Sequence, residues 1–349
     1  AAIRSPTLPE LLLRVQVARD RGRIDEAVAL LGPLREGGDP GESAMLASTL
    51  GTLELLRQRF RAAEAALTRA VALDPTRGEA RRELINLYAA QGRLADAEIQ
   101  FRALERASES HPLEFADLYL WTVGRREDLG PAELAEALTR AVSHDPADRH
   151  SRLALAENLR RLGRLDDAQA ALEPLTGLDA EARALRVRLA LDRGEVERAG
   201  TMLAETPADL ADAPAIARLR GRLALVKGDA SAAIHAYRIA LREAPDDRDA
   251  RFGLAQALRL AGEAASARPL ADSVQARDRL DWLVQNARPP DRRGDPATLR
   301  AIGDACLALG RREQARAWYR LALARDPLNG DLQRALFRLS GPGDDSRPE

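Results

Sequence analysis

The residues of this chain that could do chemistry are few and widely spaced. The four histidines are His111, His144, His150 and His235, and the single cysteine is Cys306. A metal site needs several His, Cys or carboxylate ligands at close spacing, and neither His144 nor His150 has a cysteine or a paired acid nearby. Both flank a predicted turn, where a solvated histidine is the simpler interpretation. The sequence therefore predicts no metal centre and no cofactor.

Motifs for covalent and phosphate chemistry are also missing. The chain contains no Gly-x-Ser-x-Gly nucleophile motif and no glycine-rich loop that ends in Gly-Lys-Ser/Thr. Acidic residues are abundant, but they stand among arginines on predicted helix faces, which is typical of solvated surface. Cys306 lies in an apolar helical stretch and is expected to be a small buried residue. We therefore expect a protein that is not an enzyme.

The composition narrows the class further. The 349 residues carry 53 basic and 54 acidic side chains, and this near balance argues against a nucleic-acid partner. A hydrophobic content of 45% with only 3% aromatic residues is typical of stacked, alanine- and leucine-rich helices. No apolar run of about 18 residues occurs, so no membrane span is predicted. The compartment stays open: the cytoplasm, or the bacterial periplasm if a signal or anchor preceded Ala1.

A recurring set of small residues indicates the elements that organise the chain. Successive members are 36, 34, 37, 34, 31, 34, 34 and 48 residues apart. They are Ala27, Ala63, Ala97, Leu134, Ala168, Ala199, Ala233, Ala267 and Ala315. A glycine stands five residues before seven of them, namely Gly22, Gly92, Gly163, Gly194, Gly228, Gly262 and Gly310. So regular a period predicts a repeat architecture.

Each element of the repeat has a mechanical reason, which one copy illustrates. Gly228 can end a helix in the left-handed conformation. Ala233 stands where two antiparallel helices cross closely, and a larger side chain there would overpack. Tyr237 lies one turn further along the same face and fills the core. Pro245 then stops the second helix.

This pattern resembles the tetratricopeptide repeat (TPR), a helix–turn–helix of about 34 residues. The stretch around Leu84, Tyr88, Gly92, Ala97 and Phe101 matches the family pattern, and the resemblance covers about residues 8 to 340. It implies an all-α fold, a superhelical solenoid of antiparallel helix hairpins. Two departures stand out. The family's first-helix tryptophan is absent, and the fourth copy has Leu134 in place of alanine and starts its second helix one residue late at Gly130-Pro131.

The resulting domain prediction is a single solenoid over residues 1–340 with a flexible tail at 341–349. The nine repeats are predicted at about 8–36, 43–76, 78–111, 113–147, 149–178, 180–206, 213–247, 248–288 and 296–329, followed by a capping helix at 331–339. About 14 extra residues separate the eighth and ninth copies, so the segment 276–295 is predicted to lengthen the second helix before a loop. Within it, Trp282 either packs on a neighbouring repeat or stands exposed as an anchor for a partner.

In this family the first helices line a concave face that binds peptides, so the resemblance implies a binding groove. The predicted inner-face residues are Gln16, Thr52, Arg82, Asn86, Tyr119, Glu157, Arg188, Arg218, Arg222, Phe252, Gln256, Arg300 and Asp304. Of these, Arg82 and Asn86 match the first pair of the family's carboxylate clamp. The following copies have Leu120, His150 and Ala154 where the clamp needs Asn, Lys and Arg, so a full clamp is not predicted.

Four of these positions, Arg188, Arg218, Arg222 and Arg300, could form a positive ribbon for an acidic peptide. The alternative is an ordinary arginine-rich surface that nearby acids neutralise. The predicted function is a non-catalytic scaffold that binds a peptide or protein segment in the groove. Two other hypotheses are an accessory module of a larger bacterial envelope or polysaccharide-export assembly and an accessory domain of a multidomain enzyme.

Overall fold

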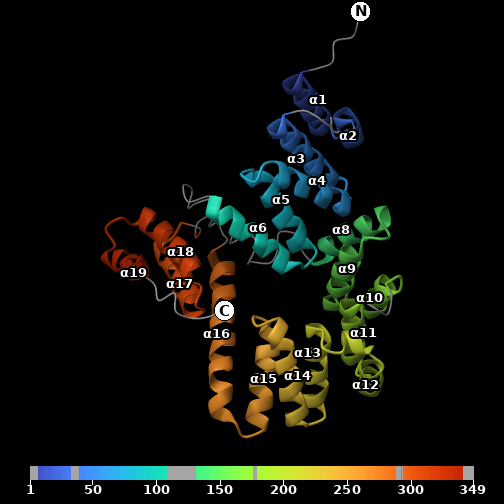
Figure 1. Ribbon diagram of the computed structural model, residues 1–349, viewed down its shortest axis with the longest axis vertical. Helices are drawn as coiled ribbons and strands as arrows, with labels where there is room; N and C mark the ends of the chain where they lie inside the picture. The colour runs from blue at the N-terminus through green and yellow to red at the C-terminus, as the bar shows by residue number, and fades with distance from the viewer. Residues whose placement is uncertain are drawn as a thin grey trace, which may run out of the picture. The chain divides into compact units, whose positions relative to one another are not determined.

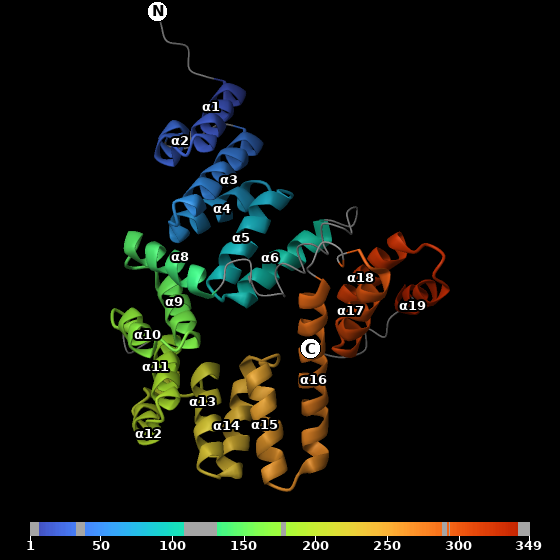
Figure 2. The ribbon, with the colours of Figure 1, turned by 180° about the vertical axis from the view of Figure 1, so that it is seen from behind.

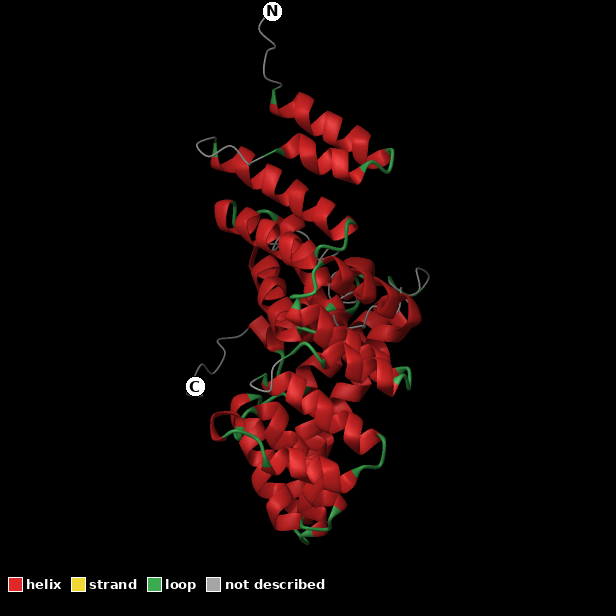
Figure 3. Cartoon of the chain, turned by 90° about the vertical axis from the view of Figure 1, so that its right-hand side faces the viewer, coloured by secondary structure: helices red, strands yellow, loops and turns green. Residues whose placement is uncertain are grey.

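The computed structural model describes residues 7–32, 39–107, 131–175, 179–287, 292 and 294–340. Within these ranges all regular elements are helices, as Figure 3 shows in red, which confirms the predicted all-α fold. By its internal contacts the chain divides into two compact units, residues 1–111 with 125–162 and residues 112–124 with 163–349. The single solenoid expected over 1–340 stays a prediction.

The first unit is built of antiparallel helix pairs joined by turns of a few residues. Within each pair the two helices pack on one another, and the second helices of the first two pairs also pack on the first helix of the next pair (Figure 1). The pairs are α1 (Leu8–Asp20) with α2 (Ile24–Leu31), α3 (Pro40–Leu56) with α4 (Phe60–Leu73), and α5 (Gly78–Ala90) with α6 (Leu94–Ala107). The helix α8 (Pro131–His144) packs on α9 (Arg149–Arg161).

The second unit repeats the same pairing. Its helices are α10 (Leu165–Leu172), α11 (Ala180–Asp192), α12 (Val196–Ala204), α13 (Pro214–Val226), α14 (Ala230–Glu243), α15 (Arg248–Leu260), α16 (Ala264–Ala287), α17 (Pro296–Ala308), α18 (Arg312–Arg325) and α19 (Gly330–Ser340). A short 3-10 helix at Ala208–Leu210, which the sequence did not predict, precedes α13. The first helix α13 also contacts the first helices α11 and α15, and Figure 2 shows α13, α14 and α15 side by side.

The seven predicted turn glycines all adopt the left-handed backbone conformation, with φ between 70° and 82°. Residues with a Cβ atom rarely adopt this conformation, so glycine ends each first helix at little cost and lets the chain reverse within about three residues. The turn between α3 and α4 has no glycine, and there Gln58 takes the same conformation with φ 57°. This glycine prediction is confirmed.

The small residues at the helix crossings are buried as predicted. Ala27, Ala63, Ala97, Ala168, Ala199, Ala233 and Ala315 are 0% exposed, and Ala267 is 1% exposed. The fourth copy differs, because Leu134 is only half-buried and the neighbouring Ala135 is buried at 3% exposure. Leu134 therefore does not occupy a tight crossing, which fits the volume of a leucine side chain.

Aspartates cap six of the described helices, a detail that the repeat pattern did not predict. The side chains of Asp39, Asp148, Asp179, Asp229, Asp247 and Asp295 each accept a hydrogen bond from the backbone N–H three residues on. An N-cap of this kind satisfies one otherwise unpaired donor and is worth about 1 kcal/mol. These caps set the helix starts of α3, α9, α11, α14, α15 and α17.

The insertion between the eighth and ninth pairs continues α16 to Ala287, which confirms the lengthened second helix. Leu280, Val284 and Ala287 are buried. Trp282 is 53% exposed and lies under the guanidinium of Arg279, 4.8 Å from its carbon to the ring centroid. Trp282 thus lies outside the buried stripe, and whether it packs on a neighbouring repeat or anchors a partner stays a prediction.

A buried polar network in the first unit joins the turn after α5 to the start of α9. Arg93 pairs with Glu64 at 2.8 Å, and the amide of Gln91 donates to the Ser151 hydroxyl at 3.1 Å. Ser151 in turn donates to the capping carboxylate of Asp148 at 2.6 Å. Because Gln91, Asp148 and Ser151 are buried, these bonds satisfy groups that would otherwise be costly to remove from water. They hold α9 against the α5–α6 pair.

The described residues show neither a membrane-spanning helix nor a metal-binding cluster. In that part of the chain no helix combines the length and the apolar character needed to cross a membrane. The same residues contain no group of three or more His, Cys, Asp or Glu side chains placed to hold a metal ion. Cys306 is 0% exposed, as expected for a small core residue.

Candidate protein-binding surface

Side chains spaced one turn apart on α11, α13 and α15 form the surface that best fits the sequence prediction. We call it the first-helix surface. It comprises Arg188, Asp192, Arg218, Arg222, Val226, Phe252, Gln256 and Leu260. On each helix the members recur every four residues, so they share one face. Five of them, Arg188, Arg218, Arg222, Phe252 and Gln256, are predicted inner-face residues.

Tyr237, on the second helix α14, packs against the buried side of this surface. The ring of Tyr237 on α14 packs against Gly221 of α13 and Gly253 of α15. A Cβ atom on Gly253 would lie 2.1 Å from the ring carbon Cζ, so only glycine admits the ring there. Tyr237 is 3% exposed, and burial raises its pKa to about 12, with Arg222 and Arg218 close enough to oppose that rise. The tyrosine thus spaces α13 from α15.

Arg218 is held by the neighbouring helix rather than free to take a ligand. It donates to one oxygen of Asp247 at 2.8 Å, while the other oxygen of Asp247 caps α15 through the backbone N–H of Ala250 at 3.0 Å. A second acid, Asp249, lies 3.9 Å away. Arg218 and its acids therefore form an interhelix contact between α13 and α15.

Arg222 is less constrained. Its side chain is 47% exposed, and its ion pair with Asp192 of α11 is 3.7 Å long, beyond hydrogen-bond distance. An exposed pair of this length contributes little to stability. The Arg222 guanidinium can therefore turn toward a carboxylate brought by a partner.

Apolar side chains lie beside these charges. Val226 is 59% exposed, Phe252 45% and Leu260 57%. Val226 follows Arg222 by one turn on α13, and Leu260 follows Gln256 by one turn on α15. The sequence prediction included Phe252 and missed Val226, Leu260 and Asp192. The signal that could have found them is the same four-residue step, continued to the last turn of each first helix.

The remaining predicted residues lie elsewhere. Arg82 and Asn86 are half-buried on α5, in the first unit. Glu157 on α9, in the same unit, accepts hydrogen bonds from Arg160 and Arg161 at 3.0 Å each, within its own helix. Tyr119 lies outside the described residues.

Arg300 belongs to the second unit but to a different helix, α17, beyond the lengthened α16. It pairs with Asp331 of α19 at 3.3 Å and with Asp304 at 3.9 Å. Asp304 also accepts a hydrogen bond from the Tyr319 hydroxyl at 2.6 Å. Acids thus stand beside Arg218, Arg222 and Arg300, as the alternative to the positive ribbon describes.

Comparison with protein families agrees with this geometry. A family model described as tetratricopeptide repeat matches residues 48–112 and 218–281, and a second model of the same description matches residues 301–327. The range 218–281 contains most of α13 and all of α15, which together carry most of the first-helix surface. The chain is a TPR protein. The predicted resemblance is confirmed, and the helix pairs within the matched ranges are TPR hairpins.

Several solved structures are similar to this TPR protein at low identity and low TM-score. The APC/C hetero-tetramer Cut9–Hcn1 is 16% identical over 95% of this chain and 63% of that chain, with a TM-score of 0.41. This chain therefore spans less than two thirds of that one. The human IFIT1 dimer with PPP-AAAA is 13% identical over 92% and 91%, with a TM-score of 0.40. PilF of Pseudomonas aeruginosa is 17% identical over 63% and 100%, with a TM-score of 0.31. No curated protein matches the chain.

The TPR fold is typically that of a non-catalytic scaffold for protein–protein interactions, and TPR proteins bind protein partners. This much of the predicted function is supported. The acidic character of the partner and the exclusion of nucleic acid stay predictions.

Proposed function

We propose that this TPR protein is a non-catalytic scaffold whose first-helix surface binds a segment of a partner protein. The observation that carries the proposal is the exposure of Val226, Phe252 and Leu260 on two adjacent first helices. Single exposed apolar residues are ordinary on protein surfaces. Three of them beside polar side chains, one an aromatic, form the kind of centre around which protein interfaces are built.

The chemistry of the surface favours a partner with both apolar and acidic side chains. Val226 and Leu260 occupy equivalent last-turn positions on α13 and α15, so an apolar side chain of the partner would contact both. Arg222, one turn before Val226, would meet a carboxylate. Arginine is suited to this contact because its planar fork binds a carboxylate through two N–H groups. Asp192 competes only weakly for it at 3.7 Å.

The test is a selection followed by affinity measurement. A random peptide library displayed on phage is selected against the full chain, and recovered peptides are titrated by fluorescence anisotropy. We expect peptides that carry Asp or Glu next to apolar residues. Phe252→Ala should weaken their binding by about tenfold or more, since a central aromatic contact is typically worth over 1.4 kcal/mol. Arg222→Glu should weaken it similarly through charge repulsion.

The matched control is Arg238→Glu, which makes the same charge change at an exposed position of α14, a second helix. Its affinity for the selected peptides should equal that of the unaltered chain. If Phe252→Ala and Arg222→Glu also bind with unchanged affinity, the first-helix surface is not the binding site. If the peptides respond to Phe252→Ala alone and carry no acids, the acidic part of the proposal is wrong.

A further inference from the structure

The second helix α16 carries a row of exposed side chains on one face. Its members follow one another by four, three, four and three residues, so they lie along one side of the helix. We call this row the α16 stripe, and none of its members belongs to the first-helix surface. The members, all exposed, are Arg268, Asp272, Gln275, Arg279 and Trp282.

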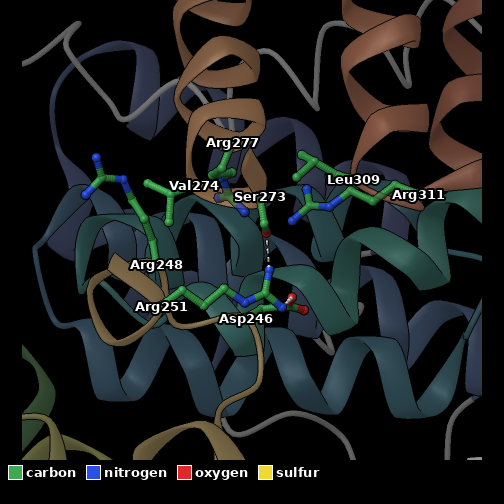
Figure 4. A pocket seen from close by; sticks show the side chains of 8 residues that line it. All are labelled: Asp246, Arg248, Arg251, Ser273, Val274, Arg277, Leu309 and Arg311. Atoms are coloured by element: carbon green, nitrogen blue, oxygen red, sulfur yellow. Dashed lines mark hydrogen bonds and ion pairs between the residues drawn. The ribbon is translucent and has the colours of Figure 1, made fainter. Parts of the chain in front are cut away.

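The opposite face of α16 is occupied by contacts within its own unit. Val274 and Leu280 are buried, and the Ser273 hydroxyl accepts a hydrogen bond from Arg251 of α15 at 2.7 Å. Figure 4 shows Ser273, Val274 and Arg277 of α16 in a recess that Arg251 also lines. These contacts fix the rotation of α16 about its own axis, so the α16 stripe faces away from the helices that pack on it.

The charged members of the α16 stripe are weakly engaged within the chain. Arg268 and Asp272 form an ion pair of 4.0 Å, and their side chains are 85% and 67% exposed. A pair of this length is beyond hydrogen-bond distance and contributes little to stability. Among the residues that the structure describes, no acid pairs with Arg279, and its guanidinium lies over the ring of Trp282. These charges can therefore be paired by a second molecule.

The order of these side chains is self-complementary when two copies of α16 pack antiparallel. Alternating steps of four and three residues are the spacing along the seam of two packed helices. A two-fold axis at Gln275 sets Arg279 of one copy opposite Asp272 of the other, where an ion pair can form. The same axis sets Trp282 opposite Arg268, since both lie seven residues from Gln275, and a guanidinium can stack on the indole ring. The two Gln275 amides meet at the axis, where each can donate to and accept from the other.

We infer that two copies of this chain associate through the α16 stripe as a symmetric dimer. Every member of the stripe then gains a partner of matching chemistry, and the same pairing occurs twice, as a two-fold interface requires. The stripe is about 21 Å long at 1.5 Å per residue, and a helix is about 10 Å wide. This face is smaller than the roughly 800 Å² that each partner buries in a stable interface. The dimer is therefore weak and forms only at raised concentration.

The experiment is sedimentation velocity of the full chain over a concentration series that reaches about 300 µM, well above the micromolar dissociation constants of weak complexes. We expect the average mass to rise from that of one chain toward that of two. Asp272→Arg and Arg279→Asp should each weaken the dimer by about tenfold or more, because like charges would face each other at two places. Trp282→Ala should weaken it by about tenfold or more, since it removes an aromatic contact from both copies.

Mixing the two charge variants gives the sharpest comparison. Asp272→Arg and Arg279→Asp in equal amounts should associate with each other although neither dimerises alone. In the mixed pair the native Arg279 faces the native Asp272, and the two substituted side chains face each other with opposite charges. A variant that had merely lost its fold would not be rescued in this way.

The control is Arg320→Asp, which makes the same charge change at an exposed position of α18. It should dimerise like the unaltered chain. A chain that stays monomeric at the highest concentration would overturn the inference, and so would charge variants that do not associate when mixed. If Trp282→Ala instead weakens binding of the phage-selected peptides, the stripe binds a different protein and the dimer is wrong.

Discussion

At the scale of single residues, the packing of this protein depends on matched pairs of glycine and a large side chain. Gly51 receives Leu67, Gly303 receives Tyr319, and Tyr237 lies against both Gly221 and Gly253. In each case a Cβ atom on the glycine would lie within 3.0 Å of the partner side chain, too close for van der Waals contact. A glycine within a helix costs about 0.5–1 kcal/mol relative to alanine, and here the close approach of two helices compensates that cost.

This pairing predicts opposite effects for two identical substitutions. Gly253→Ala should destabilise the fold by about 1–3 kcal/mol, because its Cβ would overlap the Tyr237 ring. Gly200→Ala on α12 should instead stabilise it by about 0.5–1 kcal/mol, because its nearest neighbour would be a Leu223 methyl at 3.7 Å. Urea unfolding measures both. A stabilising Gly253→Ala would contradict the placement of Tyr237 between α13 and α15.

At the scale of the elements, each hairpin is held by an alanine at its crossing, a left-handed turn and, in six of the described helices, an aspartate cap. These features act locally, within one or two turns of sequence. Asp247 shows how a local feature gains a second role, because the oxygen that does not cap α15 accepts a hydrogen bond from Arg218 of α13. Cap and interhelix contact are then lost together if this aspartate is replaced.

The buried alanines predict that the two helices of a hairpin cross closely, with no room for a larger side chain. Ala233 and Ala315 are both 0% exposed, so Ala233→Leu and Ala315→Leu should each lower the free energy of unfolding by about 1–3 kcal/mol. Thermal unfolding followed by circular dichroism gives the effect. A comparison is Ala232→Leu, at an exposed position of the same helix α14, which should change stability little. Unchanged melting in both crossing variants would show that the helices do not approach closely there.

At the scale of the whole molecule, buried tyrosines in both units couple stability to alkaline pH. Burial raises the pKa of Tyr88 in the first unit and of Tyr237 in the second to about 12. An unfolded tyrosine ionises near pH 10. The folded state therefore binds these protons more tightly. The stabilisation is fully present below about pH 10 and is lost as the pH rises toward about 12.

Urea unfolding at a series of alkaline pH values tests this dependence. The free energy of unfolding should fall between about pH 10 and pH 12, and it should fall less steeply in the double variant Tyr88→Phe, Tyr237→Phe. Arginine supplies almost all of the positive charge and stays protonated in this range, so it does not mask the effect. An equally steep fall in the double variant would assign the titration to other groups.

Much of the fold could be predicted because its signals are local and repeated. Gly228, Ala233 and Pro245 each act within a few residues, and the same offsets recur along the chain, so an error in one copy is corrected by the others. The fourth copy is the exception. Leu134 followed the numerical period, yet its side chain is too large for a tight crossing, and the neighbouring Ala135 is the buried residue.

The site was only partly predictable, because charges act between elements that are far apart in sequence. The period predicts that Arg218 and Arg222 share one face of a first helix, but their acids, Asp247 and Asp192, belong to neighbouring elements. Helical spacing therefore could not show that Arg218 is held while Arg222 is exposed.

The sequence by itself determined the class of this protein and the helix pairs of the described residues, since helical period and turn chemistry depend on neighbours along the chain. The tertiary structure alone decided which arginines are paired, that Tyr237 supports two first helices, and that Trp282 faces outward. These contacts and exposures depend on the distances between helices, which are set only when the hairpins pack against one another.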